Sequence, residues 1–220
     1  KKTELSEFER VRTTGKIAIS LIEGDELIGA ELTYGDDDII IASSSGKCIR
    51  FNEKDVRKTG RGSQGVISIR LDEDDFVVDM SIVKEGKEVI TITENGYGKR
   101  TDIDEYRLQG RAGKGIKAGN FTEKTGRLVN MKLVGEDEDI IITTDNGIMI
   151  RTRADCISKI GRATQGVRIM RLDLSAKVVS LAATPRDEEA EYDNVEVDEE
   201  EIRQARLEEE QAKQLPEDEE

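Results

Sequence analysis

Short runs of alternating apolar and polar residues recur along this chain, with the period of two that is typical of half-buried β-strands. Ile17, Ile19 and Leu21 alternate with polar neighbours, and the same phase returns 50 residues later. The alternation predicts a first type of strand in three places: residues 17–21, 67–71 and, in a shorter form, 116–118.

Each alternating run is followed by further strand-like segments in a fixed order. A second strand is expected at 27–30, 76–80, 128–131 and 178–181. A third, almost continuously apolar strand is expected at 39–41, 89–92 and 140–142, a composition that fits burial on both faces. Tight hairpin turns that lead into a fourth strand are then predicted at Ser45-Gly46, Asn95-Gly96 and Asn146-Gly147. The last unit stops after residue 183, before any third or fourth strand.

A glycine-rich loop precedes each alternating run and sets the period of the chain. The loops are Gly60–Gly65, Gly110–Gly115 and Gly161–Gly166, with a shorter relative at Thr13–Lys16. Their last glycines lie 50, 50 and 51 residues apart, and a fixed period of this size indicates an array of similar units. Four short strands per unit are typical of a propeller blade. We therefore expect an all-β, propeller-like array of four-stranded blades, in an incomplete ring.

Charge separates a neutral body from an acidic tail. The chain of 220 residues has a net charge of −14, is 37% charged and contains no Trp. Residues 186–220 hold 17 Asp and Glu against 4 Lys and Arg, which leaves 31 acidic and 30 basic residues in 1–185. The expected body comprises repeats at about 1–51, 52–101, 102–152 and 153–184. The tail at 186–220 is mostly too acidic to pack, so it is expected to be disordered or partly helical, with a charged helix at 198–214.

Several protein classes are disfavoured by what the sequence contains. No apolar run approaches the ~18 residues that a membrane span needs, and no targeting segment is evident, so no membrane partner and a cytoplasmic location are expected. Cys48 and Cys156 stand alone and the chain has no His, which argues against a zinc site and for reduced thiols. The commonest general base is therefore missing, and no Ser or Cys has an evident activating partner. No catalytic residue and no metal site are expected.

Two short segments partly match nucleotide-binding motifs, but the residues around them do not fit such a site. Gly60–Gly65 matches the pattern G-x-G-x-x-G, but a dinucleotide loop must open a helix, whereas this loop opens an alternating strand. Gly113-Lys114 lacks the earlier glycine of a phosphate-binding Walker loop, since Leu108 stands there. Acidic pairs such as Asp74-Asp75 lie in turns, where solvated caps are the ordinary explanation. A nucleotide site is therefore not predicted.

Basic residues recur at equivalent positions of successive units. Arg61, Arg111 and Arg162 share one loop position, and Arg50, Arg100 and Arg151 share one position of the fourth strand. In a radial array each set forms an arc of cations, which suits a polyanion held by its phosphates without a sequence code. The alternative is structural: these arginines pair with acids of the neighbouring blade and fix the spacing. The full candidate set is Arg50, Lys58, Arg61, Lys99, Arg100, Arg107, Arg111, Lys114, Lys117, Arg151, Arg153, Lys159 and Arg162.

Two segments, Glu94–Thr101 and Gly161–Val167, resemble the C-terminal domain of bacterial DNA gyrase A, a β-pinwheel. The resemblance covers residues 1 to about 184 and identifies them with the last three to four blades. It implies non-sequence-specific binding and wrapping of double-stranded DNA, in support of negative supercoiling by a heterotetramer with the rest of gyrase A and with gyrase B. ATP and magnesium belong to other parts of that enzyme, so no cofactor is expected here. The family's catalytic tyrosine region is absent.

The signature box of that family, Gln-Arg-Arg-Gly-Gly-Lys-Gly, has only a degenerate counterpart here, at Gln109–Gly115. We expect the true box to lie upstream of residue 1. Similar acidic tails are thought to modulate wrapping in relatives, and here the tail either competes with DNA or merely keeps the protein in solution. Two alternatives to a gyrase domain stay open: a C-terminal domain of the topoisomerase IV type, and a propeller-type protein-interaction module.

Overall fold

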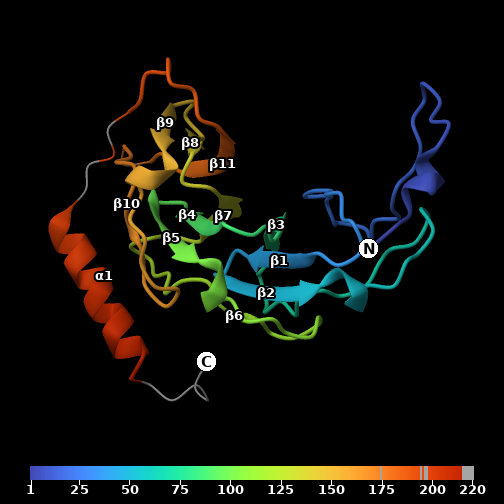
Figure 1. The fold of residues 1–220 in the computed structure, drawn as a ribbon, viewed down its shortest axis with the longest axis horizontal. Coiled ribbons are helices and arrows are strands. Elements are labelled where there is room, and N and C mark those ends of the chain that lie inside the picture. Colours follow the sequence, from blue (N-terminus) through green and yellow to red (C-terminus); the bar gives the residue numbers. More distant parts are fainter. Residues whose placement is uncertain (174, 194, 196–197, 215–220) are drawn as a thin grey trace.

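The computed structural model describes residues 1–173, 175–193, 195 and 198–214. In the described part of the chain, three antiparallel sheets follow one another along a curved body, and a single α-helix lies against its side (Figure 1). The expected all-β architecture is confirmed. The strands are β1 Asp38–Ser43, β2 Lys47–Asn52, β3 Val77–Ile82, β4 Glu88–Thr93, β5 Tyr97–Asp102, β6 Ile116–Lys117, β7 Leu128–Val134, β8 Glu138–Thr144, β9 Met149–Arg153, β10 Val167–Arg168 and β11 Val178–Pro185. Short 3-10 helices span Leu5–Phe8, Glu53–Asp55, Ile103–Glu105 and Ala154–Cys156.

Each sheet collects its strands from successive sequence units. The strand orders are β3-β1-β2-β6, β10-β5-β4-β7 and β11-β8-β9. In the first sheet, the β1–β2 hairpin comes from one unit, β3 from the next and β6 from the unit after that. The second sheet repeats this plan, and the third lacks a strand at the position of β6 and β10 in the described part of the chain. One sequence repeat therefore does not correspond to one sheet, because each sheet combines strands from more than one repeat.

The apolar third strands form the core, as expected from their continuous hydrophobicity. All six residues of β4 are buried. Ile90 packs with Ile140 of the following unit, whereas its neighbour Val89 packs with Ile40 and Tyr106 on the other face. The glycines of the hairpin turns have positive φ, 85° at Gly46 among them, which L-residues adopt only at a cost. Hairpins of this kind place the fourth strand beside the third in β1–β2, β4–β5 and β8–β9.

Two of the expected strand types do not form at the start of the chain. Residues 17–21 and 27–30 are irregular, and Ile17, Leu27 and Ile28 are each more than half exposed. In the sheets, a second strand pairs with the third strand of the preceding unit, and a first strand with the fourth strand two units earlier. No described strand stands in those positions for residues 17–30. The segment 67–71 is limited for the same reason to one bridge, between Ile69 and Gly113.

The acidic tail contains a helix that packs against the body. Helix α1, Glu199–Ala212, starts at Asp198, whose side chain accepts hydrogen bonds from the backbone N–H groups of Glu200 and Glu201. Ala205 is 2% exposed and forms a small apolar cluster with Ile160, Val167 and Ile202. The helix lies within the expected range 198–214, and its narrow apolar stripe packs on the body although the composition of the tail predicts a segment mostly too acidic to pack. Residues 215–220 of the tail lie outside the described ranges.

No helix within the described residues is long and apolar enough to cross a bilayer. Cys48 is buried and Cys156 is exposed, and both are free thiols.

Candidate nucleic-acid interface

The arginines of the glycine loops tie each unit to the unit before it. Their Nη1 atoms donate to backbone carbonyl oxygens 44 or 45 residues earlier, at 2.6 to 2.8 Å, in the pairs Arg61–Ile17, Arg111–Ile67 and Arg162–Lys117. All three side chains are half-buried. The loop arginines therefore link neighbouring units, as the structural alternative requires, and keep part of their surface in contact with solvent.

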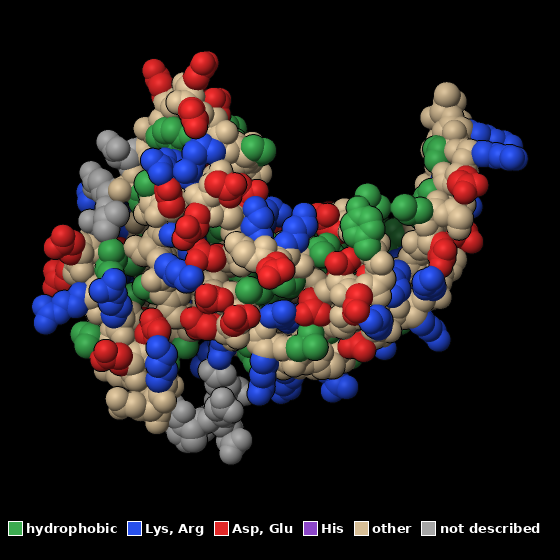
Figure 2. Space-filling model, viewed as in Figure 1, with side chains coloured by type: hydrophobic (Ala, Val, Ile, Leu, Met, Phe, Trp, Pro, Cys, Tyr) green, Lys and Arg blue, Asp and Glu red, His purple; other side chains and the backbone are tan. Residues whose placement is uncertain are grey.

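A second group of candidates is exposed near the same loops. Arg107, Lys114 and Lys117 make no ion pair with any described residue. Lys58 and Lys159 are also exposed, but Lys58 pairs with Glu4 and Lys159 with Glu88. Figure 2 shows Lys and Arg side chains projecting from the lower, convex edge of the body. Arg107, Lys114 and Lys117 all belong to one unit, whereas Lys58 and Lys159 lie two repeats apart, before their respective loops. Exposed cations distributed along a curved edge suit a polyanionic backbone.

The fourth-strand arginines have a different environment, in which each one meets an acid of its own hairpin. The pairs and their N–O distances are Arg50–Asp38 at 2.9 Å, Arg100–Glu88 at 2.6 Å and Arg151–Asp139 at 2.7 Å. The unit two further along contributes carbonyl oxygens, such as that of Ile157, which accepts from Arg100 Nε at 2.9 Å. Acids of neighbouring units are reached by longer ion pairs, Arg100–Glu136 at 3.8 Å and, for the loop arginines, Arg61–Glu7 at 3.9 Å. A structural role is favoured for the three fourth-strand arginines.

Asp139 shows how firmly such a pair is held. Its side chain is fully buried, which by itself would raise its pKa. Hydrogen bonds from Arg151, from the backbone N–H of Asp187 and from the hydroxyl of Tyr192 nevertheless hold the pKa of this carboxyl below its usual range. The pair is therefore charged at neutral pH and forms part of the core.

Lys99 lies inside the protein, and the structure does not present it to a ligand. The residue is 0% exposed. Its Nζ donates to the carbonyl oxygens of Gly161 and Thr164, both at 2.9 Å, and to that of Arg162. Burial lowers the pKa of Lys99 to about 7, while Glu105 acts in the opposite direction. Arg153, the last candidate, is exposed and paired with Asp155.

Sequence reasoning missed two exposed arginines. Arg57 lies 50 residues before Arg107, and Arg168 lies 51 residues after Lys117. The side chain of Arg168 contacts Tyr97, with its guanidinium carbon 5.2 Å from the ring centroid. The repeat spacing alone could have identified both positions, because each is the counterpart of a residue already in the candidate set.

The acidic helix covers the third glycine loop. The backbone N–H of Gly161 donates to Glu209 at 3.0 Å, and the side chain of Gln165 donates to Glu208 at 2.8 Å. The backbone N–H of Arg168 donates to Glu201 at 2.9 Å. Carboxylates thus occupy loop groups that could otherwise face a phosphate. Among the described residues, no cluster of three or more His, Cys, Asp or Glu side chains is arranged to hold a metal ion.

Interleaved antiparallel sheets with a repeat of about 50 residues, and cations on the loop of each unit, define a propeller-like binding domain. The profile of the family described as "DNA gyrase C-terminal domain, beta-propeller" matches residues 1–33, 37–84, 87–134 and 138–185. This chain belongs to that family. The four matched segments show the same period as the glycine loops.

Curated relatives agree with this assignment. The chain is 45% identical to DNA gyrase A of Escherichia coli (strain K12) over 191 residues, and 45% identical to DNA gyrase A of Staphylococcus aureus (strain NCTC 8325 / PS 47) over 193 residues. These matches cover 86% and 87% of this chain but 22% of each relative, so the chain spans about a fifth of their length.

Solved structures share the fold. A structure described as "Structure of DNA gyrase A C-terminal domain" superposes with a TM-score of 0.74 and 31% identity, over 82% of this chain and 60% of the other. The C-terminal domain of DNA topoisomerase IV gives a TM-score of 0.78 at 19% identity, over 83% of this chain and 58% of the other. At that identity the second match shows the fold alone.

Proposed function

We propose that this domain binds double-stranded DNA through its phosphates and bends the duplex along the convex edge of the body. The observation that carries the proposal is the recurrence of exposed cations next to the glycine loops in a chain of the gyrase family. Arg107, Lys114 and Lys117 are the residues best placed for such contacts, because no described acid neutralises them. The domain itself needs no catalytic residue and no cofactor for this task.

A curved array suits bending better than a single strong site does. Smoothly bending 20 to 30 bp by 40 to 90° costs of order 1 to 6 kcal/mol. A wrapping surface must therefore distribute many modest contacts along an arc, and units that repeat every 50 or 51 residues supply them. Within the whole enzyme, with gyrase B and ATP, we propose that the bent duplex supports negative supercoiling.

DNA binding across a salt series tests this proposal. Neutralising Z phosphates gives a log-log slope of about −0.9Z. We expect the triple variant R107E/K114E/K117E to have a slope shallower by about 2 to 3, and to bind more weakly on every duplex sequence alike. A loss confined to one sequence would contradict backbone recognition.

Lys84→Glu is the matched control, since Lys84 is exposed at the turn between β3 and β4, away from the glycine loops. This variant should keep the parental slope. A slope near zero in the unmodified protein would favour a protein-interaction module instead. Assembly with the remaining parts of the enzyme and a plasmid topology assay separates the other alternative: negative supercoiling supports gyrase, and relaxation without supercoiling supports a topoisomerase IV type.

We further propose that the acidic helix competes with DNA for the third glycine loop. The observation in favour is that Glu201, Glu208 and Glu209 bond directly to groups of residues 161–168. These carboxylates lie where a phosphate would approach Arg162 and Arg168. Deleting residues 186–220 should therefore tighten DNA binding at low salt, and unchanged affinity would contradict the idea.

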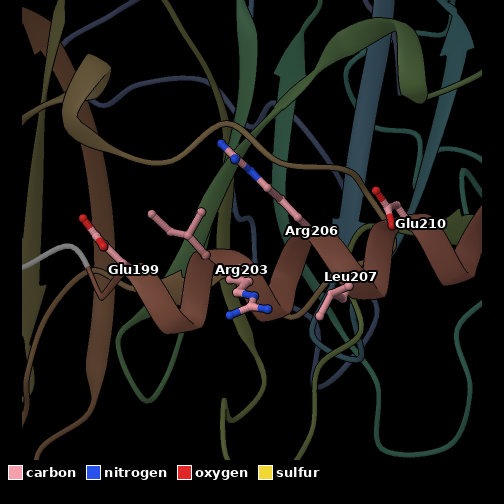
Figure 3. A pocket seen from close by; sticks show the side chains of 6 residues that line it. Glu199, Arg203, Arg206, Leu207 and Glu210 are labelled. Carbon is pink, nitrogen blue, oxygen red and sulfur yellow. The ribbon is translucent and has the colours of Figure 1, made fainter.

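Two sets of Glu→Gln variants distinguish the effect of the helix contacts with the loop from the effect of the helix's net charge on DNA affinity. E201Q/E208Q/E209Q removes three docked charges, while E199Q/E200Q/E210Q removes three that make no ion pair with a described residue. Figure 3 shows Glu199 and Glu210 with Arg203, Arg206 and Leu207 around a shallow pocket on the helix, which none of the docked glutamates lines. We expect the docked set to raise affinity about fivefold or more, as a typical coupling between sites does. An equal effect of the control set would show that only net charge matters.

A further inference from the structure

Two lysines hold the backbone of two glycine loops in the same way. Lys99 Nζ donates to the carbonyl oxygens of Gly161, Arg162 and Thr164. Lys1 Nζ donates to the carbonyl oxygens of the equivalent loop residues: Gly60 at 2.9 Å, Arg61, and Ser63 at 3.3 Å. Each ammonium has one further acceptor, Ala18 O at 2.9 Å for Lys1 and Thr164 Oγ1 at 3.2 Å for Lys99. An ammonium has three hydrogens and no acceptor, so a cluster of loop carbonyls can use all of its donors.

The two lysines occupy the same place in the repeat. Each directly precedes a residue that forms a parallel bridge to the segment before a glycine loop: Lys2 with Lys58, and Arg100 with Lys159. Arg50 bridges to Leu108 in the same manner, and the residue before it is Ile49. The middle loop, Gly110–Gly115, therefore has no ammonium at its centre.

The loop sequence changes together with this residue. The two loops held by lysine carry a hydroxyl residue at their fourth position, and its side chain closes the loop: Ser63 Oγ donates to Gly60 O at 3.0 Å, and Thr164 Oγ1 to Gly161 O at 2.9 Å. The loop beside Ile49 has Gly113 at that position, where an added Cβ atom would lie 3.6 Å from the Ile49 Cδ1 atom. Ala112 in that loop has φ of 65°, so its backbone follows a different path.

We propose that Lys99 is a positioning residue, whose ammonium fixes the Gly161–Gly166 loop so that Arg162 is presented to a phosphate, and that Lys1 does the same for Arg61. This inference rests on the proposed function for its ligand, and on loop geometry for its mechanism. Arg162 lies between two groups whose carbonyls bind Lys99, so its backbone cannot turn without breaking those bonds. Lys99 itself is enclosed and touches no ligand.

The test compares Lys99→Met with Ile49→Met in the full chain, followed by amide hydrogen exchange. Methionine keeps the length and removes the donors. We expect exchange in residues 161–166 to rise about tenfold or more in Lys99→Met, with residues 110–115 unchanged. Ile49→Met should leave residues 161–166 unchanged. Unaltered exchange in residues 161–166 of a folded Lys99→Met variant would overturn the proposal.

A double-mutant cycle then connects the loop to DNA. Arg162→Ala and Lys99→Met should each make the salt slope shallower by about 1, and Lys99→Met should add nothing in the Arg162→Ala background. Additive effects would overturn the link to Arg162 and leave Lys99 as a general stabiliser. If the unmodified protein shows no salt-dependent DNA binding, the proposed function fails, while the exchange result still decides the role of Lys99.

Should Lys99→Met not fold, Lys1→Met provides the same test on an exposed residue. Its readouts are exchange in residues 60–65 and a cycle with Arg61→Ala. Exchange in residues 60–65 should rise about tenfold. No change there would overturn the proposal for both lysines, because their contacts are equivalent.

Discussion

The guanidinium of Arg100 lies almost wholly inside the protein, where it contacts Glu88 at 2.6 Å and is 7% exposed. Taking two charges out of water is costly, and the cost is recovered only when each is fully paired and hydrogen-bonded. Arg100 meets this condition, because the carbonyl of Ile157 accepts from its Nε atom. The residue is therefore held by charge within its own hairpin, and its hydrogen bond joins that hairpin to the unit two further along.

Removing one partner of this pair should be strongly destabilising. We expect Arg100→Ala to lower the free energy of unfolding by up to about 3 to 5 kcal/mol, because it leaves the buried Glu88 with only the more exposed Lys159 as a counterion. Arg153→Ala, which breaks the exposed pair with Asp155, should cost much less. Urea denaturation measures both changes. Similar losses in the two variants would show that burial of the Arg100 pair contributes little.

The sequence could not separate Arg100 from Arg107, although it identified both as basic residues in a repeated array. Arg100 is buried because strands of three units close around it, and Arg107 is exposed because it follows a short 3-10 helix at the edge. Exposure of a cation depends on pairings between units, which the local pattern does not contain. Lys99 illustrates the same limit, since its buried position follows from a loop two units along the chain.

Among the elements, the hairpin strands were predictable and the first strands were not. Third and fourth strands pair with each other across a turn, so Asp38–Ser43 and Lys47–Asn52 need only local sequence to form. First strands depend on a partner two units earlier, as Ile116–Lys117 does on β2. Residues 17–21 have the same alternating pattern without such a partner among the described residues, and they stay irregular.

The glycine that ends each loop is needed where the next strand meets its distant partner. Gly115 has φ of 74°, and a Cβ atom there would lie 2.4 Å from the carbonyl oxygen of Cys48. Gly147, in a hairpin turn, has a similar φ of 84° but no atom within 4 Å of such a Cβ. A comparison of substitutions at the two positions therefore distinguishes the cost of backbone strain from the cost of close packing.

We expect Gly147→Ala to cost about 1 to 2 kcal/mol, which is the strain of a left-handed backbone alone. Gly115→Ala should cost clearly more, because its added methyl group must also displace the backbone of β2. Thermal unfolding of the two variants under identical conditions checks this order. Equal losses of stability in the two variants would mean that β2 can move away from the added methyl group at no cost in free energy.

At the scale of the whole molecule, the tail completes the end of the array. In earlier units the carbonyls of Arg50 and Arg100 accept from Gln109 and Ile160 of a following unit, at 2.8 and 2.9 Å. The carbonyl of Arg151 accepts at 2.9 Å from Asp193, which belongs to the tail. The composition of residues 186–220 indicates a solvated extension, whereas part of that segment satisfies the backbone of the last hairpin.

Because every sheet takes strands from later units, no single repeat is a removable part. Cutting out one stretch of 50 residues would leave β1–β2 without its β3 edge and a later hairpin without its first-strand partner. During synthesis, the first sheet closes only when Ile116–Lys117 has left the ribosome, long after β2. The order of the units along the chain therefore determines which strands can pair. Gain or loss of a whole unit would change strand pairing in more than one sheet.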